Sequence, residues 1–264
     1  MRIGDAVRSS ALEPREARLL LAAATGFSEA SVLAHPEKDI PEKEKSVFRE
    51  MAERRAKGEP VAYLLGRKEF YGLEFVVNAA VLIPRPETEL LVELALRRNP
   101  RSLLDLGTGC GAIALALKAH LPKARVVAVE ASLAALRVAR RNAARLGRCV
   151  DFRHGLWFGP VAAERFEVIV SNPPYVSSGD AHLTDLRFEP RAALIAGADG
   201  LDAIRGIIPR APAHLAPGGW LLLEHGLGQA SAVCAQLGRS GLEDVQSWPD
   251  LAGIRRVSGA KLGH

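Results

Sequence analysis

The sequence predicts an α/β protein whose mostly parallel sheet follows a small helical domain, and two observations lead to this prediction. From Ser102 onward, short apolar runs alternate with stretches of helix-forming residues, which is typical of a parallel sheet covered by helices on both faces. Residues 1–65 instead carry helix signals and no clear strand. A chain of 264 residues is long enough for one or two domains with a sizeable core.

Two helices are well marked within the first 65 residues. Pro14 suits a first helical turn, residues 16–24 are strong helix formers, and Gly26 stands where a C-terminal cap belongs. A second helix is expected to begin at Pro41 and to end near Gly58, because its apolar residues recur on one face. We therefore expect residues 1–65 to form a helical domain.

A β-hairpin is expected next, as a linker over residues 66–82. Gly72 and Leu73 suit a two-residue turn between two short segments, residues 68–71 and 74–77. The linker leads into Ile-Pro-Arg-Pro-Glu-Thr-Glu at residues 83–89, in which a proline and acidic residues favour the start of a helix. We place the main domain at residues 83–264.

Seven strands are expected in this main domain. The runs that predict them lie at residues 103–106, 126–129, 150–153, 168–170, 220–223, 245–248 and 256–258. Helical stretches follow Gly111 and occupy residues 133–146, 202–215 and 229–237. Because neighbouring parallel strands need a crossover connection, usually a helix, this order predicts a mostly parallel seven-stranded sheet.

Composition and charge exclude several classes of protein. Hydrophobic residues make up 48% and charged residues 25%, as in ordinary globular proteins. The net charge of +5 permits an acidic partner without requiring one, and a mixed, solvated surface is expected. Three cysteines far apart predict neither a disulfide framework nor a metal site and favour a reducing compartment. With no signal peptide or membrane span expected, we predict a cytoplasmic protein.

A glycine-rich loop directly follows the first strand of the main domain. It reads Asp105-Leu106-Gly107-Thr108-Gly109-Cys110-Gly111, and its glycines let the backbone approach a ligand closely. The spacing differs from the Gly-x-Gly-x-x-Gly of dinucleotide binders. Glu130 ends the next strand, where α/β nucleotide sites place a carboxylate for ribose hydroxyls. We predict a ligand site at the carboxyl ends of the strands.

Asn172-Pro173-Pro174-Tyr175 follows the fourth strand and therefore falls at the same edge of the sheet. Two prolines remove two backbone donors and leave the carbonyls of Asn172 and Pro173 unpaired, which makes a rigid polar notch. The Asn172 side chain and the Tyr175 ring would hold a planar group that carries an NH2. A proline turn that merely ends a strand is the plainer interpretation.

Together the two motifs resemble the class I S-adenosylmethionine-dependent methyltransferases that act on exocyclic or amide nitrogens. More narrowly, the chain resembles the peptide chain release factor glutamine N5-methyltransferases. The matching segments, beyond the two motifs, are residues 83–89, Glu189-Pro190 with Ala193-Leu194, Asp199-Gly200-Leu201, Glu224-His225-Gly226 and Asp250-Leu251-Ala252-Gly253. The resemblance covers nearly all of residues 60–257 and implies a Rossmann-like domain after a helical substrate-recognition domain and a hairpin.

The resemblance also implies roles for individual residues. The cofactor S-adenosylmethionine would contact the loop and its neighbours, through Asp105, Leu106, Gly107, Thr108, Gly109, Glu130, Trp157 and Asn172. The glutamine of a Gly-Gly-Gln tripeptide in a release factor would enter a pocket formed by Arg85, Asn172, Pro173, Pro174 and Tyr175. Asn172, Pro173 and Tyr175 would be the catalytic residues, with no metal.

This sequence departs from the family pattern at two positions. Glu130 stands where the family usually has Asp, and Leu156 stands where an acid usually precedes the aromatic residue near the adenine. The longer carboxylate of Glu130 can still accept ribose hydrogen bonds. The leucine removes one expected contact to the adenine amino group.

Two other functions fit the same motifs. A nucleic-acid methyltransferase acting on adenine N6 or guanine N2 would present a similar NH2 to the notch, but extruding a base usually needs extra binding surface. A regulatory module that binds the cofactor without catalysis would not need the Asn-Pro-Pro-Tyr notch. We therefore expect a monomeric enzyme whose partner is a release factor, without direct binding to nucleic acid or membrane.

Other reactive residues have plainer explanations. Cys110 has no histidine at a readable spacing to activate it, so a small side chain tolerated in the loop explains it better than a nucleophile does. His225 follows a buried strand and is expected to be a hydrogen-bonded structural residue. Glu87 and Glu89 fit the N-terminus of a helix.

Overall fold

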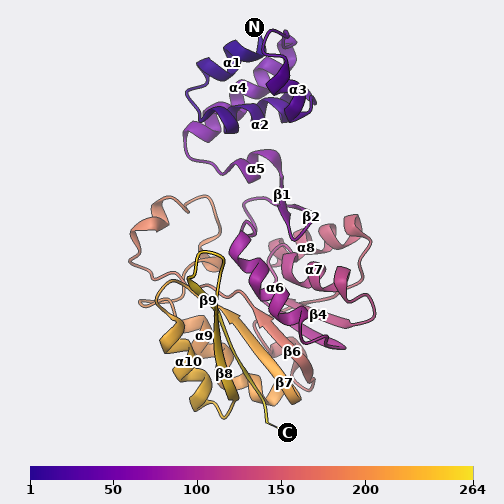
Figure 1. The fold of residues 1–264 in the computed structure, drawn as a ribbon, viewed down its shortest axis with the longest axis vertical. Helices are drawn as coiled ribbons and strands as arrows, with labels where there is room; N and C mark the ends of the chain where they lie inside the picture. The colour runs from indigo at the N-terminus through magenta and orange to yellow at the C-terminus, as the bar shows by residue number, and fades with distance from the viewer. Residues whose placement is uncertain (264) are drawn as a thin grey trace. The chain divides into compact units, whose positions relative to one another are not determined.

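The computed structural model describes residues 1–263 (Figure 1). Contacts between residues divide the chain into two compact units, Met1–Arg67 and the part that begins at Lys68. The first unit is helical, and the second contains the hairpin and the α/β sheet.

Five helices make up the first unit: α1 (Ile3–Ser9), α2 (Pro14–Thr25), α3 (Glu29–Ala34), α4 (Glu42–Ala56) and α5 (Val61–Leu65). The two predicted helices are α2 and α4. Glu13 caps α2 by accepting hydrogen bonds from two backbone N–H groups, and Gly26 ends it with a φ of 74°. The apolar faces enclose a core that includes Ile3, Leu20 and Phe48. The unit therefore has a hydrophobic core of its own.

The predicted hairpin consists of β1 (Arg67–Phe70) and β2 (Leu73–Val76). Its turn lies at Tyr71 and Gly72, one residue earlier than expected. Both residues have positive φ angles, 50° and 72°, as a type I′ turn requires. The Glu89 carboxylate accepts a hydrogen bond from the Tyr71 N–H at 2.9 Å. This contact from 18 residues away helps to hold Tyr71 in a conformation that is uncommon for a tyrosine.

All seven predicted strands are confirmed, in the order β5-β4-β3-β6-β7-β9-β8. They are β3 (Ser102–Leu106), β4 (Arg125–Glu130), β5 (Asp151–His154), β6 (Phe166–Ser171), β7 (Leu215–Glu224), β8 (Glu243–Pro249) and β9 (Arg255–Lys261). The pairs from β5 to β7 are parallel, and β9 is antiparallel to both neighbours. The strand order reverses beside β3, and such a switch point leaves a crevice at the carboxyl ends of the strands.

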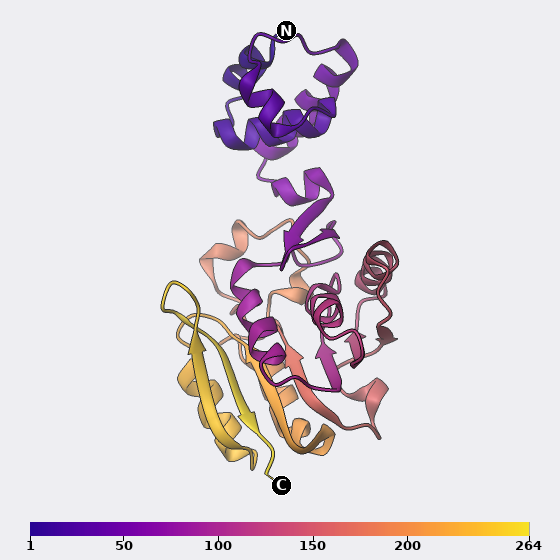
Figure 2. The same ribbon diagram turned by 45° about the vertical axis from the view of Figure 1, so that its right-hand side comes forward.

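Helices cover both faces of this sheet (Figures 1 and 2). On one face lie α6 (Glu89–Leu96), α7 (Ala112–His120) and α8 (Leu133–Leu146), and on the other lie α9 (Asp202–Ile207) and α10 (Ala230–Arg239). Short 3-10 helices occupy Pro86–Thr88, Gly159–Val161, Ala181–Thr184, Arg191–Ala193 and Ile208–His214. Alternate residues of the central strands, such as Leu104 and Ile169, pack with Ile204 and Val233 in one buried core.

The buried side chain of Asn142 joins the hairpin to the glycine loop. Its amide oxygen accepts a hydrogen bond from the Val76 N–H at 2.7 Å. Its amide nitrogen donates to the carbonyls of Val76, at 3.0 Å, and Cys110, at 2.9 Å. A fully buried amide in the middle of α8 thus has partners at both ends, as a buried polar group requires.

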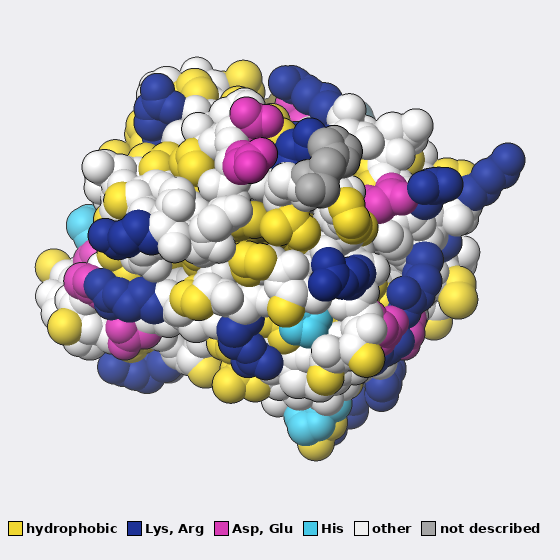
Figure 3. All heavy atoms as spheres, turned by 90° about the horizontal axis from the view of Figure 1, so that it is seen from below, with side chains coloured by type: hydrophobic (Ala, Val, Ile, Leu, Met, Phe, Trp, Pro, Cys, Tyr) yellow, Lys and Arg dark blue, Asp and Glu magenta, His cyan; other side chains and the backbone are white. Residues whose placement is uncertain are grey.

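Charges of both signs are mixed on one face of the surface. On the face that Figure 3 shows, Lys and Arg side chains are spread among acidic and apolar ones. Within residues 1–263, no helix is long and apolar enough to span a membrane.

Candidate active site

A cavity of about 400 Å³ opens at the carboxyl ends of β3, β4 and β6. Its walls come from the hairpin exit, the glycine loop, the end of β4 and the segment after β6. Among the predicted site residues it brings together Gly107, Gly109, Glu130, Trp157, Asn172 and Pro174. Its volume lies in the range of pockets that bind small molecules and cofactors.

The glycine loop forms one wall of this cavity with its backbone. Gly107 and Gly109 have φ angles of 74° and 57°, which L-residues rarely adopt. A Cβ atom at Gly107 would lie 3.5 Å from the Trp157 ring. The missing side chain of Gly107 therefore leaves space between the loop and the indole, while a Cβ atom at Gly109 would meet nothing within 4 Å.

Glu130 connects the end of β4 to both neighbouring segments. Its carboxylate accepts hydrogen bonds from the N–H of Gly109 and the N–H of Ser132, both at 2.8 Å. Each carboxylate oxygen retains a further lone pair. Glu130 can thus hold the loop in place and still accept a hydrogen bond from a ligand in the cavity.

Three predicted cofactor residues belong to the loop segment but do not line the cavity. Asp105, Leu106 and Thr108 are buried, and Leu106 belongs to the hydrophobic core. The Thr108 hydroxyl donates to one Asp105 oxygen at 2.6 Å, while the other oxygen has no partner in the described residues. Burial, with a smaller contribution from Glu130, raises the pKa of Asp105 to about 7. Asp105 therefore supports the loop from within the sheet.

Trp157 and Leu156 form the far wall of the same cavity. Trp157 has a φ of 47°, so the chain bends sharply where the indole enters the wall. Leu156 is 62% exposed and offers no hydrogen-bonding group beside it. The flat ring suits stacking with an aromatic ligand, and the leucine adds only apolar contact.

Asn172 lies between this cavity and a second one of about 260 Å³. Its amide nitrogen donates a hydrogen bond to the Thr88 hydroxyl at 3.1 Å. Its amide oxygen is buried and has no partner among residues 1–263. An unpaired buried acceptor is costly, because it has lost water without gaining a donor. The Asn172 amide oxygen is therefore available to accept a hydrogen bond from a ligand.

The second cavity is lined by Arg85, Asn172 and Tyr175 together with apolar residues that include Leu82, Leu186 and Leu194. Tyr175 donates a hydrogen bond to Glu224 at 3.3 Å, and burial, together with the Glu224 charge, raises its pKa. Pro173 is buried and lines neither cavity, and Pro174 faces the first cavity only. The structure thus divides the Asn-Pro-Pro-Tyr motif between the two spaces.

Arg85 is held by an ion pair with Glu189. Glu189 is 4% exposed, and its other oxygen accepts a hydrogen bond from the Ile83 N–H at 3.0 Å. A buried carboxylate paired at both oxygens fixes the segment before α6 to the loop after β6. One face of Arg85 remains at the wall of the second cavity.

The sequence assigned no chemical role to Thr88, Glu189 and Glu224, which are all buried around the second cavity. Glu189 and Glu224 belong to segments that carry the family resemblance, but their partners are distant in sequence. Thr88 accepts a hydrogen bond from Asn172, 84 positions away, and Glu224 accepts one from Tyr175, 49 positions away. The sequence signal that could have indicated these buried residues is a charged residue within or beside an apolar run, as in Leu-Leu-Leu-Glu at the end of β7.

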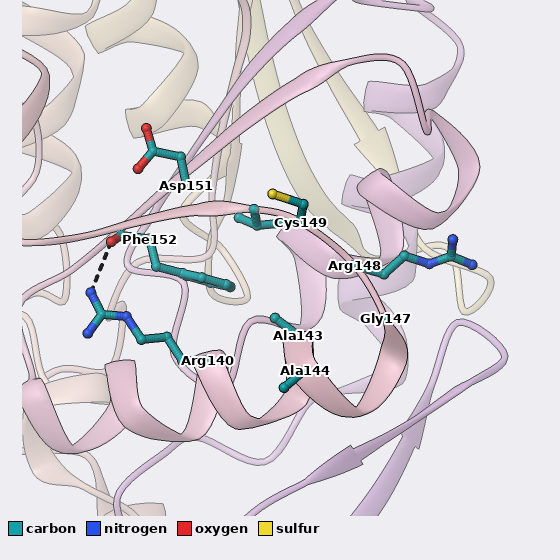
Figure 4. Close-up of a pocket in the computed structure, with 9 residues that line it drawn as sticks. Arg140, Ala143, Ala144, Gly147, Arg148, Cys149, Asp151 and Phe152 are labelled. Atoms are coloured by element: carbon teal, nitrogen blue, oxygen red, sulfur yellow. Dashed lines mark hydrogen bonds between the residues drawn. The ribbon is translucent and has the colours of Figure 1, made fainter.

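Cys110 and His225 take structural roles in the described residues. Burial raises the pKa of the Cys110 thiol to about 12, which disfavours the thiolate that a nucleophile needs. The buried His225 ring nitrogen Nε2 lies 2.8 Å from the Ser258 hydroxyl. A further cavity of about 600 Å³, shallow and open, lies beside the end of α8 and contains none of the predicted site residues (Figure 4).

Two family models match parts of this chain. Residues 6–66 match the PrmC N-terminal domain, and residues 86–188 match the methyltransferase small domain. A methyltransferase from Pyrococcus furiosus has a similar structure, with a TM-score of 0.59 and 21% identity, covering 80% of this chain and 98% of that chain. This likeness shows the fold alone.

Two curated relatives cover almost the whole chain. The release factor glutamine methyltransferase of Neisseria gonorrhoeae is 48% identical over 255 residues, which cover 94% of this chain and 93% of the relative. The protein of the same name from Xylella fastidiosa is 47% identical over 260 residues, covering 96% and 94%. The chain therefore belongs to the family of release factor glutamine methyltransferases.

Proposed function

We propose that this protein transfers a methyl group from S-adenosylmethionine to the side-chain amide nitrogen, N5, of the glutamine in the Gly-Gly-Gln motif of peptide chain release factors. The observation that carries this proposal is the position of Asn172. Its unpaired amide oxygen lies where two cavities meet, one beside the glycine loop and the other beside Tyr175. A donor and an acceptor of a methyl group need such a meeting point.

The residues of the first cavity fit S-adenosylmethionine. Gly107 and Gly109 let the methionine part approach the backbone, and Glu130 has a free lone pair for the ribose hydroxyls. The Trp157 ring offers a face for the adenine. When bound, the cofactor supplies an electrophilic methyl group on a sulfonium. The buried carboxyl of Asp105 lies behind the loop and would favour a positively charged ligand.

The second cavity fits the side chain of a glutamine. Apolar residues around it would contact the methylene groups, while the NH2 would donate to the Asn172 oxygen. The Pro173 carbonyl would be the second acceptor, although Pro173 itself lines neither cavity. An amide nitrogen is a poor nucleophile, because its lone pair is delocalised into the carbonyl. Two acceptors that hold both N–H groups aim the lone pair at the methyl group and favour a pyramidal nitrogen. Positioning and exclusion of water then supply most of the rate, and the proton leaves after transfer.

The remaining parts of the chain receive roles in the same proposal. The helical domain, residues 1–65, would bind the release factor outside the tripeptide, with residues 66–82 as linker and residues 83–264 as the catalytic domain. We expect a monomer in the cytoplasm, where the three free cysteines would stay reduced.

Mass spectrometry of a release factor after incubation with the enzyme and S-adenosylmethionine tests the proposed function. We expect one added methyl group on the glutamine of the Gly-Gly-Gln peptide. A factor with Gln→Ala in this tripeptide serves as the matched control and should stay unmodified. A parallel reaction with DNA and RNA tests the alternative acceptor, and methyl transfer to nucleic acid but not to the factor would overturn the proposal.

A further inference from the structure

The Asn172 amide can serve the proposed reaction in only one of its two orientations. An amide has an acceptor end and a donor end of similar shape. With the oxygen toward the second cavity, Asn172 accepts a hydrogen bond from the substrate NH2. With the orientation reversed, two NH2 groups would face each other, and the substrate nitrogen would lose its partner. A neighbouring group of the protein must therefore hold the Asn172 amide in the orientation that points its oxygen toward the second cavity.

Thr88 is the group that meets the other end of this amide. Its hydroxyl oxygen lies 3.1 Å from the Asn172 nitrogen, and the residue is 4% exposed. It sits at the end of the 3-10 turn Pro86–Thr88, just before α6, where proline and the first helical turn hold the backbone. A hydroxyl can also donate, so Thr88 selects the productive orientation only while its own proton points elsewhere.

Glu224 is the acceptor that can take this proton. It is fully buried at the end of β7, and one of its oxygens accepts a hydrogen bond from Tyr175. The other oxygen has no hydrogen-bond partner of normal geometry in residues 1–263. Thr88 also interacts with this carboxyl and lowers its pKa. A charged carboxylate here would draw the Thr88 proton away from Asn172 and leave the hydroxyl lone pair facing the amide nitrogen.

We infer that Thr88 and Glu224 are positioning residues that fix the Asn172 amide with its oxygen toward the substrate nitrogen. This inference rests on the proposed function and deepens it, because it names the residues that keep the acceptor in place. Tyr175 anchors the same carboxylate from the side of the second cavity. Thr88, Asn172, Tyr175 and Glu224 thus form one group of interacting side chains. Thr88 precedes α6, Asn172 and Tyr175 follow β6, and Glu224 ends β7.

Replacing the Thr88 hydroxyl tests this inference. Thr88→Val keeps the shape and removes the acceptor, so kcat should fall on the order of 100-fold. The KM for S-adenosylmethionine should stay unchanged, since Thr88 does not line the first cavity. Thr88→Ser restores the hydroxyl and should restore most of kcat. Thr25→Val, which removes a hydroxyl bonded to a backbone carbonyl in α2, is the matched control and should have wild-type kcat.

A second measurement decides the inference without turnover. NMR signals of the Asn172 side-chain NH2, assigned by their loss in Asn172→Ala, should show slow hydrogen exchange in the wild type and in Thr88→Ser but fast exchange in Thr88→Val. Unchanged exchange in Thr88→Val, or a Thr88→Ser enzyme as slow as Thr88→Val, would overturn the inference. If the wild type methylates no release factor, the proposed function fails, and the NH2 signals still decide the orientation.

The pH dependence of kcat tests the part played by Glu224. Burial, with a contribution from Glu87, raises its pKa to about 7, while Thr88, Tyr175 and Arg256 act in the opposite direction. A protonated Glu224 would no longer draw the Thr88 proton, so kcat at saturating cofactor should rise as the pH passes through about 7. Glu224→Gln should lack this rise. If kcat of Glu224→Gln rises with pH as in the wild type, Glu224 does not position Thr88.

A separate observation concerns the exposed face of α8. Residues 131–150 hold five of the 35 Lys and Arg residues and none of the 30 Asp and Glu residues, so the rest of the chain carries 30 of each sign. The entire net charge of +5 is thus concentrated in this segment. We name its exposed arginines the arginine face: Arg137, Arg140, Arg141, Arg145 and Arg148.

The arginine face lies on one side of the helix. At 100° per residue, its four helical members fall within an arc of about 140°, opposite the buried residues Leu136, Ala139 and Ala143. From Arg137 to Arg148 the face extends roughly 16 Å. Arg145 pairs with Glu74, and Arg140 donates to the Phe152 carbonyl. Within residues 1–263, the guanidinium groups of Arg137, Arg141 and Arg148 make no hydrogen bond or ion pair.

The shallow cavity of about 600 Å³ beside the end of α8 continues this face. Figure 4 shows Arg140 at one end and Arg148 extending away at the other, with Ala143, Ala144 and Gly147 between them. Small residues between two guanidinium groups leave room for a polymer backbone. Arginine, used here without a single lysine, suits phosphate groups because its planar fork can donate two parallel hydrogen bonds.

We propose that the arginine face binds the phosphate backbone of RNA, a partner that the sequence alone did not lead us to expect. Fluorescence anisotropy with a labelled oligouridine of about 16 nucleotides tests this binding over a series of salt concentrations. The triple variant Arg137→Gln, Arg141→Gln, Arg148→Gln should lose about 2 units of the slope of log K against log salt. The control triple Arg49→Gln, Lys123→Gln, Arg239→Gln removes equal charge elsewhere and should keep the slope.

Three results would overturn this second proposal. They are no binding by the wild type at low salt, an equal loss in the control triple, and tighter binding of a polyglutamate peptide of equal charge. The last result would assign the arginine face to an acidic protein instead.

Discussion

The Glu130 carboxylate accepts a hydrogen bond from the Gly109 N–H at 2.8 Å, so the end of β4 fixes the position of the glycine loop. The same side chain faces the cavity in which we propose that the cofactor binds. In the proposed function, one carboxylate would therefore serve both the shape of the loop and the recognition of the ligand.

Glu130→Ala should weaken binding of S-adenosylmethionine. Hydrogen bonds to a charged group contribute roughly 1.5–3 kcal/mol, which corresponds to a Kd increase of about 10- to 100-fold. Isothermal titration calorimetry measures this change directly. Glu130→Asp keeps a carboxylate of the kind usual in the family and should bind within a few-fold of the wild type. Wild-type affinity in Glu130→Ala would contradict the role given to this residue.

Asn172→Ala should abolish methyl transfer while leaving the cofactor largely bound. The substrate NH2 loses its side-chain acceptor, and we expect a fall in kcat of at least about 100-fold. The Kd for S-adenosylmethionine should change by about threefold or less, equivalent to under 1 kcal/mol. Single-turnover assays and calorimetry separate the two effects. Near-normal turnover in this variant would refute the proposed role of Asn172.

Asp105 should make the stability of the fold depend on pH. Its pKa is raised by burial from 3.8 to about 7 in the folded protein, so the folded state binds more protons than the unfolded state between these values. The stabilisation is complete below about pH 4 and is lost as the pH rises through about 7. Asp105→Asn has no ionisable group at this position and keeps its stability as the pH rises. The unfolding free energy of the variant minus that of the wild type should therefore increase between pH 5 and pH 8.

Urea denaturation at several pH values measures this difference, which should reach a few kcal/mol. Glu224 titrates in the same direction in both proteins, so the slope of the variant should be reduced but not zero. Parallel curves for the wild type and Asp105→Asn would show that Asp105 is already charged at low pH.

Arg85→Met should cost stability and substrate affinity together. The substitution leaves the buried carboxylate of Glu189 without its cation, which we expect to cost about 1–3 kcal/mol. Because Arg85 also lines the second cavity, the KM for the release factor should rise. Arg85→Lys retains the charge and should recover part of both losses. Thermal unfolding and steady-state kinetics provide the measurements, and an unchanged KM in Arg85→Met would remove Arg85 from the substrate site.

Removal of residues 1–67 should separate the two proposed binding functions. The part that begins at Lys68 has its own core and contains both cavities. The truncated protein should therefore bind S-adenosylmethionine with wild-type affinity, while its affinity for the release factor falls. Circular dichroism checks the fold, and calorimetry with each ligand gives the affinities. Unchanged affinity for the factor would refute the recognition role of the helical domain.

The sequence predicted the parts of the fold that local patterns determine. The seven strands are marked by apolar runs between Gly or Pro residues, and α2, α4 and α8 by long periodic segments with caps. The short helices α1, α3 and α5 lack such length and were not predicted. The hairpin turn was displaced by one residue, because the Glu89 carboxylate helps to hold Tyr71 at positive φ from outside the hairpin.

The site was predicted where it coincides with strand ends and was missed where it depends on distant partners. Gly107, Glu130 and Asn172 follow three neighbouring strands, so strand order alone brings them together. Thr88 and Glu224 approach the site through packing between α6 and β7, which no spacing in the sequence encodes. Burial of Asp105 behind the loop likewise depends on which face of β3 the helices cover.

Asn142 makes the hairpin and the glycine loop mechanically interdependent. One amide holds both the backbone of Val76 and the Cys110 carbonyl. A displacement of either segment breaks hydrogen bonds that no water can replace, because the amide is fully buried. We therefore expect a displacement of the hairpin to disturb the Asn142 side chain and, with it, the hydrogen bond to the Cys110 carbonyl of the glycine loop.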